Sequence, residues 1–149
     1  MASTMNEKFE PAQRIQNLVV ARYRDGRLVK GVTYDFGPNK KAFHVMPFDG
    51  DGKRNFLISL SELKAVFFVK SFEGKQDHPP VKEPPKDDKD AVGTMKMKIT
   101  FFDGETLIGT TQGYAPERLG FFVVPIEKDD NNLRIFALSN AVEKIETWK

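Results

Sequence analysis

Short runs in which apolar and polar residues alternate cover most of the chain, and this two-residue period predicts β-strands. In the first run Val19, Ala21 and Tyr23 fall on one face, and two arginines fall on the other. Turn-forming Gly, Pro, Asn and Asp separate the runs, and a short helical turn is expected at Ser61–Leu63. The first half of the chain contains five predicted strands: Val19–Arg24, Arg27–Phe36, Ala42–Phe48, Asn55–Leu60 and Lys64–Lys70.

The same pattern occurs a second time along the chain. Val19–Lys70 aligns with Met97–Trp148 without a gap, at a constant offset of 78 (97 − 19). Identical pairs include glycines, prolines and aromatics in one register: Asp25/Asp103, Gly26/Gly104, Gly31/Gly109, Thr33/Thr111, Pro38/Pro116, Phe43/Phe121, Val45/Val123, Pro47/Pro125, Asp51/Asp129, Leu60/Leu138 and Ser61/Ser139. We interpret this as an internal duplication. It predicts an N-terminal extension at 1–18, a first unit at 19–70, a linker at 71–96 and a second unit at 97–148.

The predicted linker has the composition of a solvated segment. Pro79-Pro80 and Pro84-Pro85 stand among Lys, Asp and Glu, and apolar residues are few until Met95. Such a segment buries too little apolar surface to offset the entropy lost on ordering. We therefore expect Glu73–Val92 to be flexible, with local stiffening by proline. The alternative is a long ordered loop, which is uncommon within compact domains.

Glycine positions indicate how each unit bends. Asp25-Gly26 and Asp103-Gly104 predict two-residue hairpins with type I′ turns. Gly31 and Gly109 fall inside predicted strands, where glycine typically marks a sharp bend or a close approach of backbones. Five short strands must bend strongly to close on themselves, so these glycines favour a small closed barrel over a flat sheet.

This order of elements resembles the SH3-like and Sm-like small β-barrels. Val20–Met46 is also similar to the first Sm-type motif, with Asp25-Gly26, then Gly31, then apolar positions. The resemblance implies an all-β fold with two homologous five-stranded barrels in tandem. A weaker resemblance is to PilZ-type barrels, which bind cyclic di-guanylate. The arginine pair of that family is missing. Its D/N-x-S-x-x-G segment is also missing, because Asp35-Phe36-Gly37 has glycine in place of serine.

Composition narrows the class of protein. The chain has 149 residues, of which 40% are hydrophobic, and its 13 Phe can supply two small cores. Because there is no cysteine, disulfides and thiolate metal sites are excluded. No apolar run approaches the roughly 20 residues of a membrane-spanning helix, and Met1–Glu10 does not resemble a signal peptide. We expect a cytoplasmic protein that does not enter membranes.

Groups able to carry catalysis are few. The only histidines are His44 and His78. His44 aligns with Phe122, which indicates packing or surface exposure rather than a ligand role, and His78 lies in the linker. Ser61 and Ser139 recur without a recurring histidine. Asp49-Gly50-Asp51-Gly52 resembles the start of a calcium loop, but no glutamate closes it. We expect no enzyme activity, no bound metal and no cofactor.

Charge divides unevenly between the two predicted units. The chain carries 23 Lys and Arg against 21 Asp and Glu, a net charge of +2. Residues 19–70 carry ten basic and five acidic residues (+5), and residues 97–148 carry five and eight (−3). Basic residues gather at the first hairpin, namely Arg22, Arg24, Arg27 and Lys30. They could bind phosphates, form a solvated edge that opposes aggregation, or attract the acidic unit.

Some runs are apolar on both faces. Ala65–Val69 and Phe121–Val124 are of this kind, and Phe102 points outward by alternation. Such strands require cover on both sides, either from the other barrel or from a partner. The candidate binding surface therefore comprises Arg22, Arg24, Arg27, Lys30, Phe68, Phe102 and Phe122.

These observations favour a non-enzymatic adaptor or regulatory protein whose tandem barrels bind a protein partner. Two sites on one chain can raise avidity without new contacts. The first alternative is binding of RNA or single-stranded nucleic acid through the basic first unit. The second is a cyclic-dinucleotide sensor of the PilZ type. The sequence leaves the oligomeric state open, a homodimer included.

Overall fold

The computed structural model describes residues 17–47, 55–71, 95–115, 117–127 and 130–148. These residues form ten strands and contain no α-helix, so the predicted all-β class is confirmed. In this part of the chain there is accordingly no helix long and apolar enough to cross a bilayer. The strands are β1 (Asn17–Tyr23), β2 (Leu28–Thr33), β3 (Ala42–Pro47), β4 (Phe56–Ser59), β5 (Leu63–Val69), β6 (Met95–Phe101), β7 (Thr106–Thr111), β8 (Gly120–Pro125), β9 (Asn132–Leu138) and β10 (Val142–Trp148).

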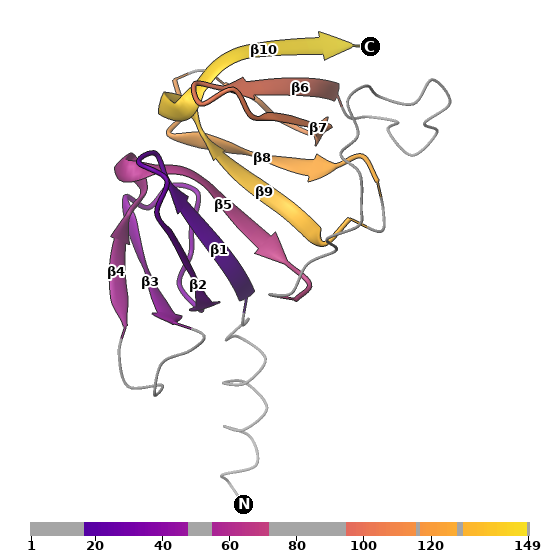
Figure 1. The fold of residues 1–149 in the computed structure, drawn as a ribbon. Coiled ribbons are helices and arrows are strands. Elements are labelled where there is room, and N and C mark those ends of the chain that lie inside the picture. The colour runs from indigo at the N-terminus through magenta and orange to yellow at the C-terminus, as the bar shows by residue number, and fades with distance from the viewer. Residues whose placement is uncertain (1–16, 48–54, 72–94, 116, 128–129, 149) are drawn as a thin grey trace, which may run out of the picture.

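All ten strands belong to one antiparallel sheet, with the order β10-β6-β7-β8-β9-β5-β1-β2-β3-β4. Two separately closed barrels are therefore not confirmed, because the sheet is continuous and ends at β10 and β4. The two halves, β1–β5 and β6–β10, are each strongly curved and meet where β5 lies beside β9 (Figure 1). β5 is buried along its whole length, since β1 covers one edge and β9 the other. We call the β5–β9 contact the junction.

The halves share one strand order, but the gap-free alignment is wrong by one residue in their later strands. In the first half Ala21 faces Val66, and in the second half Ile99 faces Ile145. Ile99 stands 78 positions after Ala21 (99 − 21), but Ile145 stands 79 positions after Val66 (145 − 66). The second half thus has one residue more than the first between its third and fourth strands. We call two residues equivalent when they occupy the same place in the two halves. The numbers of equivalent residues differ by 78 in the first three strands of each half and by 79 in the last two strands.

The Asp-Gly hairpins form, but not with the predicted type I′ turn. Gly26 and Gly104 have φ of +99° and +93°, and no other described residue has a positive φ. The Gly26 N–H donates to the Tyr23 carbonyl, and the Tyr23 N–H donates to the Arg27 carbonyl. This geometry is a three-residue loop with a glycine bulge. Asp25 supports the loop by accepting a hydrogen bond from the Arg27 N–H at 3.0 Å.

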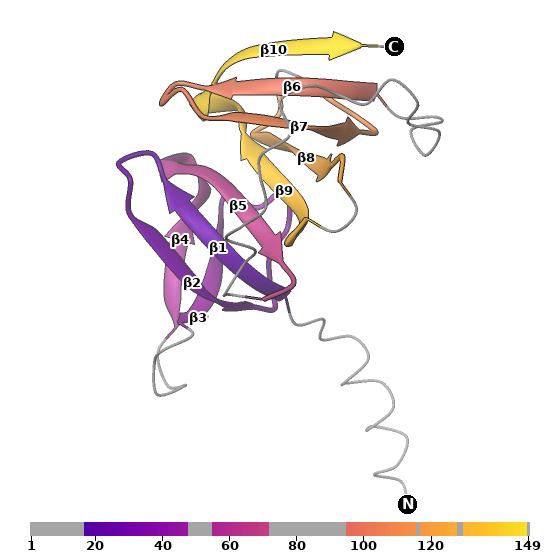
Figure 2. The ribbon, with the colours of Figure 1, turned by 45° about the vertical axis from the view of Figure 1, so that its right-hand side comes forward.

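The buried side chains form one cluster that runs through both halves, not the two small cores expected from composition. Its centre is a group of phenylalanine rings at the junction. Phe36 lies 5.1 Å from both Phe43 and Phe68, and 5.3 Å from Phe136 of the other half. Phe122 lies 5.0 Å from Phe136. Turning the molecule by 45° keeps β5 and β9 side by side (Figure 2).

Several predicted features lie outside the described residues. They include most of the linker, His78, the Asp49–Gly52 segment and most of the N-terminal extension. Where the boundaries can be compared, β1 begins at Asn17 and β6 at Met95, each two residues before the predicted unit.

Candidate binding site at the junction

Phe68 and Phe122, two members of the predicted binding surface, lie at the junction instead of facing a partner. Phe68 is buried and Phe122 is half-buried, and their ring centroids are 6.1 Å apart. The Arg134 guanidinium lies 4.5 Å from each ring and covers them with its charge. Their apolar character therefore serves packing between the halves, the first of the two explanations offered for it.

The four basic residues of the predicted surface are exposed, but they do not form one unpaired patch. Arg27 makes an ion pair with Asp25 at 2.8 Å, and its guanidinium stacks over the Tyr23 ring at 4.5 Å. The Arg22 guanidinium lies 5.4 Å from the Phe67 ring centroid. Lys30 is exposed on β2, away from the hairpin loop.

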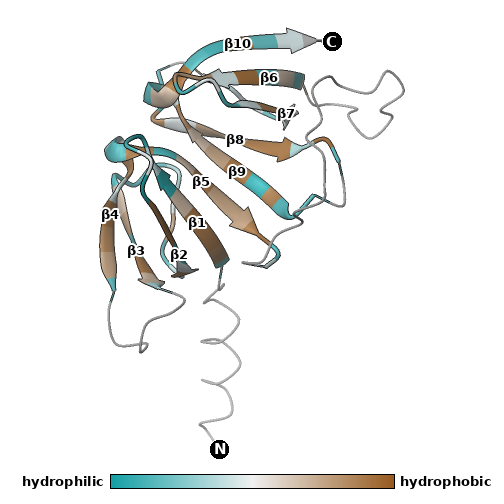
Figure 3. Ribbon diagram, viewed as in Figure 1, coloured by the Kyte–Doolittle hydropathy of each residue, from teal (hydrophilic) through white to brown (hydrophobic). Residues whose placement is uncertain are grey.

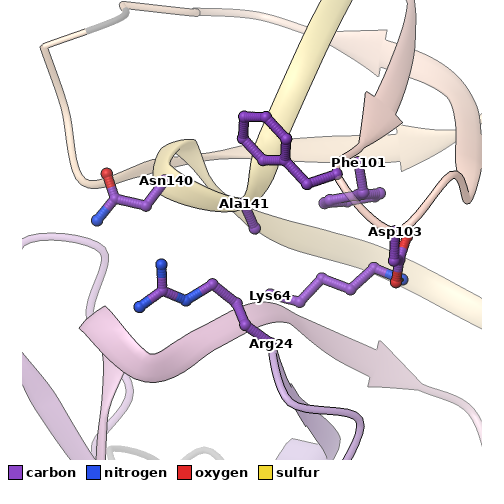
Figure 4. A pocket seen from close by; sticks show the side chains of 7 residues that line it. Arg24, Lys64, Phe101, Asp103, Asn140 and Ala141 are labelled. Carbon is purple, nitrogen blue, oxygen red and sulfur yellow. The ribbon is translucent and has the colours of Figure 1, made fainter.

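Arg24 and Phe102 come together in a pocket of about 200 Å³ between the two halves. Arg24 enters from the β1–β2 loop, and Phe102 follows β6. The pocket is lined by Arg24, Lys64, Phe101, Phe102, Asp103, Asn140 and Ala141 (Figure 4). Phe102 is 68% exposed, so its ring is available to a ligand.

Lys64 forms the floor of this junction pocket and ties the two halves together. Its side chain is buried, and Nζ donates to Asp103 Oδ2 at 2.7 Å and to the Glu105 carboxylate. The ammonium also lies 4.8 Å from the Phe101 ring centroid. Lys64 was not among the predicted site residues. The available signal was a single charge at the start of a run that is otherwise apolar on both faces.

Ionic contacts explain the lowered pKa of the Asp103 carboxyl. The largest cause is the hydrogen bond from Lys64, followed by the Glu105 backbone N–H at 2.9 Å. The nearby charge of Arg22 adds to the effect. The positive charge of Lys64 is therefore already neutralised within the protein.

Arg24, by contrast, retains capacity to bind an anion. Its guanidinium donates one hydrogen bond to the Ser61 carbonyl at 2.7 Å, which positions it at the pocket mouth. Among the residues that the structure describes, it makes no ion pair. A guanidinium has five N–H donors arranged to bind carboxylate or phosphate, so most remain for a ligand. Figure 4 shows Arg24 and Asn140 on opposite sides of the opening.

Residues 15–149 match the model of DUF6982, a family of unknown function. The chain belongs to this family. The match spans all ten strands, so the DUF6982 unit includes both halves and the junction pocket. No curated protein and no solved structure matches the chain.

A second hollow of this DUF6982 protein follows the outer strand β10. It is lined by Tyr114, Phe121, Ser139, Val142, Glu143, Lys144, Ile145 and Thr147. The Tyr114 and Phe121 rings are 4.8 Å apart at its base. We call this hollow the β10 groove.

His44 is exposed, as expected for a surface residue, and it has a partner, Asp35, that the sequence pattern did not indicate. Its Nδ1 lies 2.7 Å from Asp35 Oδ2, and its backbone N–H donates to Asp35 Oδ1 at 2.9 Å. Burial alone would raise the pKa of Asp35, but these hydrogen bonds and one from Thr33 together lower it. The pair joins the loop after β2 to β3. Within the described ranges, no group of three or more His, Cys, Asp or Glu could hold a metal ion.

We expect the Lys64–Asp103 contact to make the free energy of unfolding of this DUF6982 protein depend on pH in the acid range. A carboxyl whose pKa is lower in the folded state than in the unfolded state stabilises the fold at pH values above its unfolded-state pKa. This contribution is lost as the pH falls through the folded-state pKa. Asp103→Asn should therefore lower the free energy of unfolding at pH 7 by up to about 1 kcal/mol. The difference from wild type should shrink between about pH 5 and pH 3.

Urea unfolding of both proteins at pH 7 and pH 3 measures this change, with Glu117→Gln on an exposed turn as the control. A difference between wild type and Asp103→Asn that is equal at both pH values would contradict the prediction.

Proposed function

We propose that this protein is a non-enzymatic binding module whose junction pocket recognises a peptide segment of a protein partner. The observation that supports this most directly is the placement of Arg24, which has no described ion pair, beside the exposed ring of Phe102. We further infer that the two halves are copies of one small-barrel unit of SH3-like or Sm-like type. Their common strand order supports that inference.

The pocket chemistry favours a peptide with a carboxylate next to an apolar side chain. Arg24 can bind the carboxylate through two parallel N–H donors. Phe102 and Ala141 offer apolar surface, and the Asn140 amide can donate to or accept from a peptide group. Binding sites generally combine a mainly apolar wall with a few polar groups in this way.

Binding of single-stranded nucleic acid is the alternative, because Arg24 could bind a phosphate while Phe102 stacks on a base. The pairing of the neighbouring cations makes this alternative weaker. Arg27 is paired with Asp25, and Lys64 with two carboxylates, so only Arg22, Arg24 and Lys30 of this region have no described ion pair and remain for successive phosphates. A cyclic-dinucleotide sensor of the PilZ type has no further support, and calorimetry with cyclic di-guanylate is expected to give no heat.

Selection from a displayed peptide library tests the proposal. Wild type should enrich peptides that place Asp, Glu or a C-terminal carboxylate beside an apolar residue. A synthetic peptide of that sequence should bind at least tenfold more weakly to Arg24→Gln and to Phe102→Ala, a loss of about 1.4 kcal/mol each. Lys30→Gln on β2 and Val124→Ala on β8, at exposed positions that do not line the pocket, should bind as wild type does.

Enrichment of the same peptides by wild type and by both pocket variants would contradict peptide binding at this pocket. A twelve-nucleotide oligo(U) and its DNA counterpart, followed by fluorescence anisotropy, test the alternative. Binding that falls steeply with salt, in the absence of any enriched peptide, would favour the nucleic-acid function.

A further inference from the structure

The two outer strands of the sheet are equivalents of the two strands that pair at the junction. There, β5, the fifth strand of the first half, pairs with β9, the fourth strand of the second half. The fifth strand of the second half is β10, and the fourth strand of the first half is β4. Neither has a strand partner on its outer side among the described residues.

We propose that copies of this chain associate head to tail, with β10 of one chain paired antiparallel to β4 of the next. The contact between molecules would then repeat the junction within the molecule. This proposal concerns surfaces away from the junction pocket and does not rest on the peptide-binding function.

Exposed apolar residues on β4 mark one side of this interface. Leu57 is 65% exposed and Phe56 is 44% exposed. Their equivalents in β9, Phe136 and Ile135, are buried, because β5 covers them. In Figure 3 most of β4 has the brown of apolar residues, although it is an edge strand. β4 therefore carries the side chains of a junction strand without its cover.

The β10 groove is the other side of the interface. Its base, the Tyr114–Phe121 pair, is equivalent to the Phe36–Phe43 pair, whose rings are 5.1 Å apart. In the first half, Phe136 lies against that pair, 5.3 Å from Phe36. No described residue provides a counterpart of this ring in the second half, so its groove is open. The residue equivalent to Phe136 is Leu57, which a second chain would supply.

The junction also fixes the register expected between chains. Within the chain, Val66 faces Phe136 and Phe67 faces Ile135. The equivalent pairs are Ile145 with Leu57 of the next chain, and Glu146 with Phe56 of the next chain. Ile145 is only half-buried, whereas its equivalent Val66 is fully buried. Pairing with Leu57 would complete the burial of Ile145.

Charge reversal at two equivalent positions preserves the ionic contact. At the junction, Lys64 of β5 binds Glu105 of the hairpin that follows β6. The equivalent of Lys64 is Glu143, and the equivalent of Glu105 is Arg27. Both signs are reversed, so Glu143 of one chain can meet the Arg27 guanidinium of the next. Asp103, the other partner of Lys64, is equivalent to Asp25 and keeps its sign, so Glu143 would share Arg27 with Asp25. The match of Glu143 with Arg27, together with the equivalence of the strands, favours a second copy of the chain as the occupant over an unrelated strand.

The charges on β10 also limit which strands can pair with it. Glu143, Lys144 and Glu146 make this edge polar, as Figure 3 shows in teal, and charged edge strands oppose unspecific pairing. A partner strand must therefore bring both an apolar residue for the groove and a matching basic group. β4 and the Arg27 hairpin bring both. Because the two surfaces differ, such contacts continue from chain to chain and end only when a ring closes.

Mass measurement of the full-length chain over a range of concentrations tests this association. Light scattering after size exclusion, together with native mass spectrometry, should show species larger than a monomer. Leu57→Asp should be monomeric, since it places a charge at the groove. Leu57 is exposed in the monomer, so the variant should still fold, which circular dichroism verifies. Val124→Asp, at a similarly exposed position on β8, should associate as wild type does.

The charge pair and the register supply two independent tests. Arg27→Glu and Glu143→Arg should each weaken association about tenfold, and the double variant should restore it. Since the chain has no cysteine, Leu57→Cys and Ile145→Cys can be mixed and oxidised, and the two chains should form a disulfide-linked pair. Leu57→Cys mixed with Val124→Cys is the control. A monomeric wild type, association unaffected by Leu57→Asp, or cross-linking no greater than the control would overturn the proposal.

Discussion

Replacing Phe136 with alanine is expected to lower the free energy of unfolding by about 3–5 kcal/mol. Phe136 lies on β9 and is fully buried, with ring contacts to Phe36 at 5.3 Å and Phe122 at 5.0 Å. Removing its ring would leave a cavity between the two halves. Collapse of that cavity would require movement of β5 against β9, and the hydrogen bonds between these strands oppose such movement.

Urea unfolding followed by circular dichroism measures the loss. Leu133→Ala on the same strand is the matched control, because its side chain is exposed and its removal should cost less than about 1 kcal/mol. The shared core also predicts one cooperative transition for wild type. A small effect of Phe136→Ala, or two separate unfolding transitions, would mean that the halves are stable independently of the junction.

The strands and turns were predictable because their determinants are local. Alternation placed Val19 and Ala21 on the buried face of β1, and both are fully buried. Asp25-Gly26 and Asp103-Gly104 marked the hairpins, although the exact turn depends on backbone angles that residue identity leaves open. The period-two pattern carries this information because neighbouring side chains of a strand point to opposite faces.

Register in the later strands was not predictable. The identities Leu60/Leu138 and Ser61/Ser139 favour a constant offset, yet the Leu60 N–H donates to Lys41 and the equivalent bond joins Ser139 to Leu119. A one-residue shift normally moves apolar residues to the wrong face. In β4, however, Phe56, Leu57 and Ile58 are apolar in succession. Because apolar and polar residues do not alternate in β4, the pattern does not reveal the one-residue shift.

The strand that pairs with β5 was also not predictable from the sequence. A run that is apolar on both faces shows that cover is needed, but many surfaces could provide it. Lys64 and Asp103 likewise stand 39 residues apart, and no local pattern connects them. The candidate site consists of residues from both halves, so only the pairing of β5 with β9 brings Arg24 close to Phe102.

Replacing Gly31 with alanine is expected to cost about 3 kcal/mol, because β2 and β3 approach too closely for a side chain. An added Cβ would lie 2.2 Å from the Met46 carbonyl oxygen and 2.6 Å from Val45 Cγ1. The clash is with backbone, so a change of rotamer does not relieve it. The strands would have to separate where only two residue pairs hold them together, namely Gly31 with Pro47 and Val32 with Met46.

Gly113→Ala is the matched control for this glycine, since nothing lies within 4 Å of the added Cβ and its backbone is free of positive-φ strain. We expect a change of less than about 0.5 kcal/mol there. Gly109→Ala should match Gly31→Ala, because its Cβ would lie 2.3 Å from the Val124 carbonyl oxygen at the equivalent crossing. Thermal or urea unfolding compares the three variants. If all three cost the same, the close approach of β2 to β3 and of β7 to β8 would not depend on the missing side chain. The glycines would then act only through the flexibility of the unfolded chain.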